Sequence, residues 1–232
     1  MYPLVELLTG LLFVVCYLQF GLTQAAVKWL FFTGLVIVLT IIDLRVRMLP
    51  DFVTWPGVVT GLFFSAVIPP YDGAALSLFQ GLLHRMPPTW VLGLVDGILG
   101  AVFGSLLLWG VATLYKRLRG REGMGMGDVK MMAMVGAFLG LRATFFTILL
   151  GTLLGTIVGV AMIAVLYVAG WRRPLAARAS RRGLGTEAEL RWFIVSQYQL
   201  PLGSFLGVAA LLIAYFGPQL IDHWTNLLRG YR

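Results

Sequence analysis

Charged side chains are scarce in this sequence. Asp, Glu, Lys and Arg make up 12% of the 232 residues, about half of their usual share in a soluble domain. Hydrophobic residues make up 59%, and the mean hydropathy is +0.88. So few charges cannot cover a water-facing surface, which excludes an ordinary soluble protein. Several uncharged apolar runs reach the roughly 20 residues that a helix needs to cross a bilayer. We therefore predict an all-α fold, a polytopic transmembrane helical bundle, with residues 1–232 forming one domain.

Cysteine is almost absent as well. Cys16 is the single cysteine and lies within an apolar run, so an intrachain disulfide and a metal site built on thiolates are excluded. We expect no metal and no cofactor.

Acidic residues are fewer than basic ones, 10 against 18, and the formal net charge is +8. In a soluble protein this excess would indicate nucleic-acid binding. Here the basic residues lie in short segments between apolar runs, which indicates control of membrane topology and contact with lipid headgroups. We expect membrane lipids and no nucleic acid as partners, and the sequence leaves the oligomeric state open.

Seven apolar runs are candidate membrane spans. They cover residues of about 4–22, 26–43, 52–69, 90–115, 129–141, 143–169 and 199–221. The fifth is short for a full crossing, which is typical of a tilted or partly re-entrant helix. Two longer connections separate the spans: an external loop of about 70–89, with a short interfacial helix around 75–84, and a basic cytoplasmic loop of about 170–198.

The basic residues predict the orientation of the bundle. Thirteen of the eighteen fall on one side of the seven-span arrangement. The positive-inside rule makes this side cytoplasmic. We therefore expect a cytoplasmic N-terminus and a periplasmic C-terminus.

Two aspartates differ in context from the other acidic residues. Ionisable groups within a membrane protein are costly, and they therefore mark functional sites. Asp43 ends the second predicted span and Asp128 begins the fifth. Both fall at the cytoplasmic boundary, where packing of the bundle can bring them together. Glu6 and Asp96 lie just inside predicted spans, and for them a polar interior and an interfacial position fit equally well.

Asp128 follows three glycines within five residues, 123–127. Glycine permits left-handed backbone and close approach of another chain, which suits a protease that binds extended substrate by strand addition. The same position equally suits a helix N-cap, and the spacing leaves both interpretations open. Asp51 follows Pro50, which disfavours helix in the residue before it. We predict that Asp51 is the N-cap of the third span.

Three segments resemble the type IV prepilin peptidases, the leader peptidases of pilus and type II secretion systems. Residues 42–51, IDLRVRMLPD, are similar to their I-D-x5-[IL]-P-[DN] segment. Residues 123–130, GMGMGDVK, resemble their G-x-G-D-x-K signature. The opening YPLVE, residues 2–6, is similar to the R-Y-P-[LI]-V-E segment that begins their membrane domain. The matches follow the family order.

The sequence departs from the family pattern in three places. Residues 201–206, PLGSFL, match the P-F-G-P-[FY]-L motif only loosely, with Leu202 and Ser204 where Phe and Pro are usual, so we predict no site there. Bifunctional members carry a tetracysteine zinc segment before R-Y-P, and this sequence begins where that part would end. The interval from Asp43 to Asp128 is longer than expected because of the 70–89 loop.

The resemblance implies that Asp43 and Asp128 are the catalytic dyad of an aspartic endopeptidase. It also makes Gly125, Gly127 and Lys130 candidate substrate-binding residues. Two adjacent carboxylates cannot both ionise cheaply, so one keeps a proton. The charged one would activate a water while the protonated one donates to the scissile carbonyl, which requires no metal.

The implied substrates are type IV prepilins or pseudopilins, cleaved at the cytoplasmic face of the bacterial inner membrane. We do not assign the second activity of the family, N-methylation, because we find no site for S-adenosylmethionine. Two other functions are considered. A proton-coupled transporter would use membrane carboxylates to relay ions, and a non-catalytic subunit of pilus or secretion assembly would keep the motifs without the chemistry.

Overall fold

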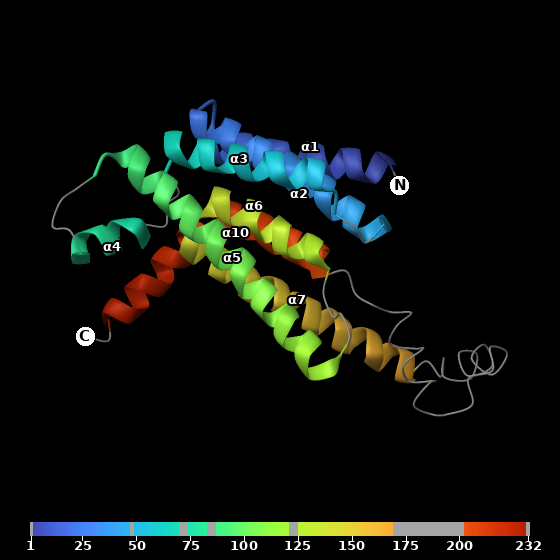
Figure 1. The fold of residues 1–232 in the computed structure, drawn as a ribbon. Helices are drawn as coiled ribbons and strands as arrows, with labels where there is room; N and C mark the ends of the chain where they lie inside the picture. Colours follow the sequence, from blue (N-terminus) through green and yellow to red (C-terminus); the bar gives the residue numbers. More distant parts are fainter. Residues whose placement is uncertain are drawn as a thin grey trace.

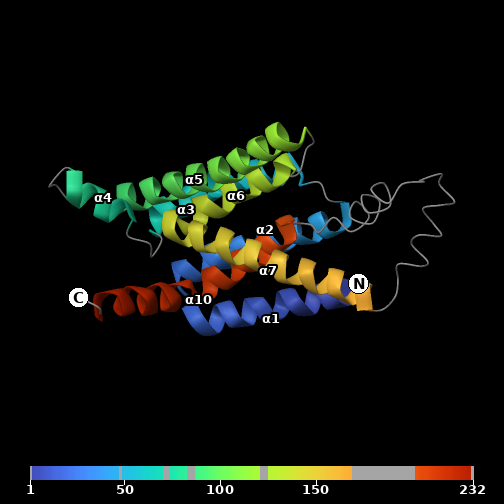
Figure 2. The same cartoon turned by 90° about the horizontal axis from the view of Figure 1, so that it is seen from below.

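The computed structural model describes residues 2–46, 49–69, 74–82, 87–120, 125–168 and 202–230, and every regular element in these ranges is an α-helix. The helices form one bundle (Figures 1 and 2). The expected all-α fold is confirmed. The helices are α1 (Tyr2–Phe20), α2 (Gln24–Val46), α3 (Asp51–Val67), α4 (Ala74–Leu82), α5 (Thr89–Arg119), α6 (Met126–Leu139), α7 (Leu141–Val168) and α10 (Leu202–Gly230).

The predicted spans match these helices to within a few residues, except that α10 continues well beyond position 221 to Gly230. Among the described residues, three helices are long and apolar enough to cross a membrane: α2, α5 and residues Leu141–Met162 of α7. Shorter apolar helices lie at Val5–Phe20, Asp51–Val67 and Leu202–Gly217. The chain is therefore a multi-pass membrane protein. The number of crossings and the orientation stay predictions, and the basic loop of about 170–198 lies outside the described residues.

The short helix α4 occupies the predicted external loop, at one end of the bundle (Figure 1). The short helix expected around 75–84 is thus observed, and its interfacial position stays a prediction. Residues 70–73 and 83–86 of that loop lie outside the described residues.

Helix α6 is the innermost helix of the bundle. It has 14 residues, or roughly 21 Å at 1.5 Å per residue, which is too short to cross a bilayer core of roughly 30 Å. Glycine lies at both of its ends, because Gly125 is the N-cap and Gly140, with φ of 84°, is the C-cap. Nearly every side chain from Met131 to Leu139 is buried. This explains why its sequence looks like a span although it is too short for one.

Small residues let α6 approach its neighbours closely. It packs against α5 and α3, and also against α7 and α10. The backbones of Gly136 on α6 and Gly100 on α5 touch, and a Cβ added to either would collide with the other helix. Within a membrane, helices associate through such close van der Waals packing, since lipid offers no hydrophobic driving force between them.

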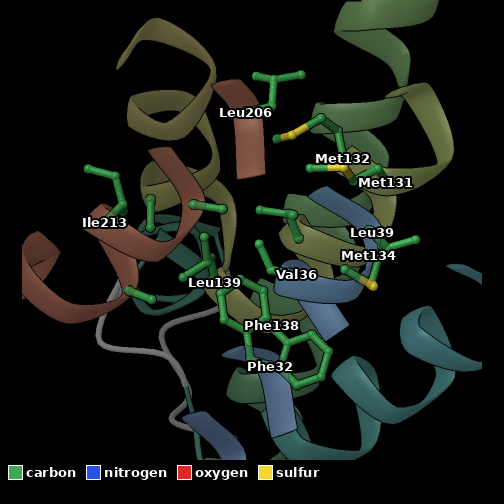
Figure 3. Packing of buried hydrophobic residues seen from close by; sticks show 14 of the residues in the cluster. Phe32, Val36, Leu39, Met131, Met132, Met134, Phe138, Leu139, Leu206 and Ile213 are labelled. Atoms are coloured by element: carbon green, nitrogen blue, oxygen red, sulfur yellow. The ribbon is translucent and has the colours of Figure 1, made fainter. Parts of the chain in front are cut away.

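The buried core joins α6 to α2 and α10 (Figure 3). The rings of Phe32 on α2 and Phe138 on α6 lie 5.1 Å apart between centroids. Methionines fill the spaces between helices, as flexible side chains do in irregular gaps. The core side chains labelled in Figure 3 are Phe32, Val36, Leu39, Met131, Met132, Met134, Phe138, Leu139, Leu206 and Ile213. This packing fixes the end of α2 beside the beginnings of α6 and α10.

Candidate active site

Asp43 and Asp128 meet at the end of the bundle opposite α4. Asp43 lies in the last turn of α2 and Asp128 in the first turn of α6. Both are buried, with exposed fractions of 5% and 9%. Side chains of the two helices meet in the core, as Phe32 and Phe138 do, and the end of α2 adjoins the beginning of α6. The structure thus brings together the two carboxylates that the sequence singled out.

Gly203, in the first turn of α10, faces both carboxylates. A Cβ built on this glycine would lie 2.7 Å from Oδ1 of Asp128 and 2.9 Å from Oδ2 of Asp43. Such distances are too short for an unstrained contact, so any side chain here would displace the acids. The two carboxylates and the backbone of α10 therefore converge on one point, and glycine is the residue that leaves room for them.

The next residue, Ser204, is hydrogen-bonded to the dyad. Its hydroxyl donates to Oδ2 of Asp43 at 2.8 Å and lies 3.4 Å from the backbone carbonyl of Thr40. One turn further along α10, Gly207 packs against the hydroxyl of Thr40. Glycines at positions 203 and 207 thus allow α10 to lie close against the last two turns of α2.

The predicted N-cap at Asp51 is wrong, and Asp128 does not take the N-cap position that its sequence context left open. The N-cap of α6 is Gly125, and Asp128 lies inside the first turn. The N-cap of α3 is Pro50, and Asp51 is the first helical residue. Neither cap makes a side-chain hydrogen bond. Asp128 is therefore free to face α10 and Asp43.

The remaining predicted site residues lie around the beginning of α6. Gly125 is exposed and has extended backbone, with φ of −72° and ψ of 141°, so it does not use the left-handed freedom that we expected. Gly127 packs against Leu49, whose Cβ would lie 2.9 Å from a Cβ added to the glycine. Lys130 donates to both carboxylate oxygens of Asp51, at 2.6 and 2.7 Å. Its ammonium group thus ties α6 to the start of α3, while Gly123 lies outside the described residues.

The sequence analysis missed Gly203 and Ser204. The signal was present, because PLGSFL loosely matches a family motif, but two departures from that motif led us to predict no site. Close contact with the dyad becomes visible only when α10 is folded against α2 and α6.

Asp96 and Glu6 differ in the structure, although the sequence allowed either a polar interior or an interfacial position for both. Glu6 is exposed. Asp96 is buried, with an exposed fraction of 3%, and its Oδ1 accepts a hydrogen bond of 2.7 Å from the backbone N–H of Ala75. Asp96 thus binds the first turn of α4, far from the dyad.

The chemistry that the dyad offers is proton transfer. Two facing carboxylates share a proton more readily than they ionise together, so they form a matched acid and base. Within the described ranges, no group of three or more His, Cys, Asp or Glu side chains is placed to hold a metal ion.

The chain is similar to known leader peptidases. The model of the type IV leader peptidase family matches residues 30–160. A "Prepilin leader peptidase/N-methyltransferase" of Aeromonas salmonicida is 38% identical over 162 residues, which cover 70% of this chain and 48% of the relative. That of Neisseria gonorrhoeae is 35% identical over 161 residues, 69% of this chain and 49% of the relative.

A third relative matches nearly the whole chain. The protein of the same name from Pseudomonas putida is 34% identical over 227 residues, 98% of this chain and 62% of the relative. The chain spans about half the length of the first two relatives. No solved structure matches it.

Proposed function

The chain belongs to the type IV leader peptidase family, and on this premise we propose that it is a membrane aspartic endopeptidase that removes the basic leader peptide from type IV prepilins or pseudopilins. One observation carries the proposal. Two buried carboxylates, Asp43 and Asp128, converge on the same point beside Gly203. The relatives named as prepilin leader peptidases support the choice of substrate.

The dyad would act by general acid–base catalysis on water. The ionised carboxylate takes a proton from a water, whose oxygen attacks the scissile carbonyl carbon. The protonated carboxylate donates to the carbonyl oxygen, where negative charge develops. Burial strengthens both steps, because charges interact more strongly away from bulk water. Asp43 and Asp128 are the catalytic residues of this proposal, and it requires no metal or cofactor.

Gly125, Gly127 and Lys130 form the substrate-binding part of the proposal. Gly125 is exposed and extended, as a backbone that pairs with an extended peptide must be. Gly127 places the first turn of α6 against Leu49, beside Asp128. Lys130 would act on the substrate as one member of its ion pair with Asp51.

We place the reaction at the cytoplasmic face of the bacterial inner membrane. The positive-inside rule puts the end of α2 and the beginning of α6 on that side. A substrate whose basic leader lies in the cytoplasm, ahead of a hydrophobic helix, would present its cleavage junction at the same depth. Prepilins and membrane lipids are the partners that this location implies.

The position of the dyad favours a peptidase over a transporter. A transporter is expected to hold its carboxylates near mid-membrane, often at broken helices. Asp43 and Asp128 instead lie within a turn of the ends of two continuous helices. N-methylation, which appears in the names of the relatives, is not part of this proposal.

Incubation of the purified full chain with a prepilin in detergent tests the proposal. We expect Asp43→Asn and Asp128→Asn each to lower the rate of leader removal by at least about 100-fold, because each removes one partner of the proton transfer. Asp96→Asn is the matched control, since it neutralises an equally buried carboxylate outside the dyad. Near wild-type cleavage by either dyad variant would refute the assignment. A wild-type protein that cleaves no prepilin would support a non-catalytic assembly role.

A further inference from the structure

The hydroxyl of Ser204 distinguishes the two aspartates. Its single proton has two acceptors within reach, the Asp43 carboxylate at 2.8 Å and the Thr40 carbonyl at 3.4 Å. The shorter contact goes to Asp43. Ser204 and Asp43 are both buried, with exposed fractions of 6% and 5%, so water does not compete strongly for this hydrogen bond. Within the described ranges, no side chain donates a hydrogen bond to Asp128.

Helix dipoles act on both aspartates, so the hydroxyl of Ser204 is the donor that distinguishes them. Ser204 and Gly203 lie in the first turn of α10, where helix N–H groups lack intrahelical partners and the helix dipole favours negative charge. Asp43 lies in the last turn of α2, where the dipole of its own helix disfavours negative charge. The beginning of α10 therefore compensates for the unfavourable position of Asp43 on α2, whereas Asp128 lies in the first turn of α6, where the dipole of its own helix favours negative charge.

We propose that Ser204 is a positioning residue that holds Asp43 as the ionised base and leaves the shared proton on Asp128. A hydroxyl that donates to Oδ2 stabilises the charged carboxylate and fixes its rotation. Asp128, which receives no such donor within the described ranges, is then the acid. This assignment rests on the proposed peptidase function.

The assignment gives each proton a defined path. Asp43 takes one proton from water as the water oxygen bonds to the carbonyl carbon, and Asp128 gives its proton to the carbonyl oxygen. The peptide C–N bond then breaks. The proton on Asp43 passes to the leaving nitrogen, and one hydroxyl of the tetrahedral intermediate returns a proton to Asp128. Both acids end in their starting states, and Ser204 keeps its proton throughout.

The test compares variants of two buried serines in the purified full chain. We expect Ser204→Ala to lower kcat for prepilin cleavage about tenfold, the order expected for loss of one hydrogen bond to a charged group. KM should not change, because Ser204 contacts Asp43 and not the substrate. Ser204→Thr keeps the hydroxyl and should retain kcat to within about threefold.

Ser65→Ala is the matched control. Ser65 is fully buried, and its hydroxyl donates to the backbone carbonyl of Ala137 on α6 at 2.6 Å, so this variant also loses a buried hydroxyl within the bundle. We expect its kcat and KM to match the wild type. The inference is overturned if Ser204→Ala keeps full kcat, if threonine fails to rescue, or if both alanine variants lose activity equally.

The outcome separates this inference from the peptidase assignment. If Asp43→Asn is inactive while Ser204→Ala is fully active, the dyad stands and the role of Ser204 is refuted. If Asp43→Asn is active, the peptidase assignment itself fails. Thermal unfolding in detergent, measured on all four variants, identifies any loss that comes from unfolding.

Discussion

The two ends of the bundle bury ionisable groups in different ways. At the end near α4, Asp96 accepts a hydrogen bond from the backbone of Ala75, and the charge of Arg142 acts on it. At the same end, the Lys28 ammonium group donates to the carbonyl of Ile68 at 3.0 Å. At the other end, two carboxylates face each other across Gly203. One end gives each buried ionisable group a hydrogen-bond partner on the backbone, and the other places two carboxylates together.

The difference between the two ends shows that the depth of burial does not by itself indicate the role of an acidic side chain. Asp96 is as deeply buried as the dyad, yet its partner is a backbone donor that stabilises the ionised form and anchors α4. Such an arrangement is structural, because the carboxylate has a hydrogen-bond donor on the helix that it anchors. Two like charges held close together cost free energy unless a proton is shared, and a shared proton is available for chemistry. The partner of a buried acid therefore indicates its role better than its depth.

The strongest test of this contrast adds a methyl group between the two carboxylates. Gly203→Ala would place a Cβ within 2.9 Å of both acids and should separate them. We expect leader removal to fall about 100-fold, as is typical when reacting groups are displaced by about 1 Å. The rate of prepilin cleavage in detergent measures it.

Gly110→Ala is the matched control for that variant, because a Cβ at Gly110 of α5 meets nothing within 4 Å. It should cleave at the wild-type rate. Equal activity of the two glycine variants would mean that the contact of α10 with the dyad has no catalytic consequence.

The second test removes the structural acid. Asp96→Ala leaves the N–H of Ala75 without its acceptor, which costs about 1–3 kcal/mol of stability for a buried group. We therefore expect a lower unfolding temperature in detergent but a cleavage rate within about twofold of the wild type. Asp96→Asn keeps an acceptor oxygen, so its stability should fall between those of Asp96→Ala and the wild type. Loss of cleavage in a folded Asp96→Ala protein would remove the distinction between the two ends.

The smallest expected effect concerns the ion pair beside the dyad. Lys130 and Asp51 are partly exposed, and such pairs contribute about 1 kcal/mol or less. We expect Lys130→Gln and Asp51→Asn to raise KM by similar factors, about fivefold or less, with kcat unchanged. Steady-state kinetics with a prepilin substrate measures both constants. A large rise confined to the lysine variant would contradict the view that Lys130 acts as one member of a pair.

The sequence predicted the helices well because their apolar runs are long and bounded. The spans, the short helix around 75–84 and the juxtaposition of Asp43 with Asp128 all follow from hydropathy and order along the chain. The predicted N-cap at Asp51 was wrong, and the cap alternative for Asp128 did not hold, because Pro50 and Gly125 occupy the capping positions. Local patterns could not show that the aspartates face partners on other helices.

The role of residues near position 203 was unpredictable for a different reason. Gly203 and Ser204 matter through contacts with residues more than 70 positions away in the sequence. A single sequence carries no record of such contacts. Likewise, the sequence could not show that Asp96 is buried, because its burial depends on the packing of α4 against α5.

The contact between α10 and the dyad also has a consequence for the biogenesis of the protein. Asp43 and Asp128 lie on α2 and α6, which are synthesised early. Gly203 and Ser204 lie at the start of α10, the last described helix, which is synthesised later. Ribosomes build the chain from the N-terminus. Both aspartates therefore reach the membrane before the first turn of α10, which contacts them. A nascent chain therefore holds an incomplete site until α10 inserts. In the proposed peptidase, the order of the chain therefore delays cleavage until α10 has inserted.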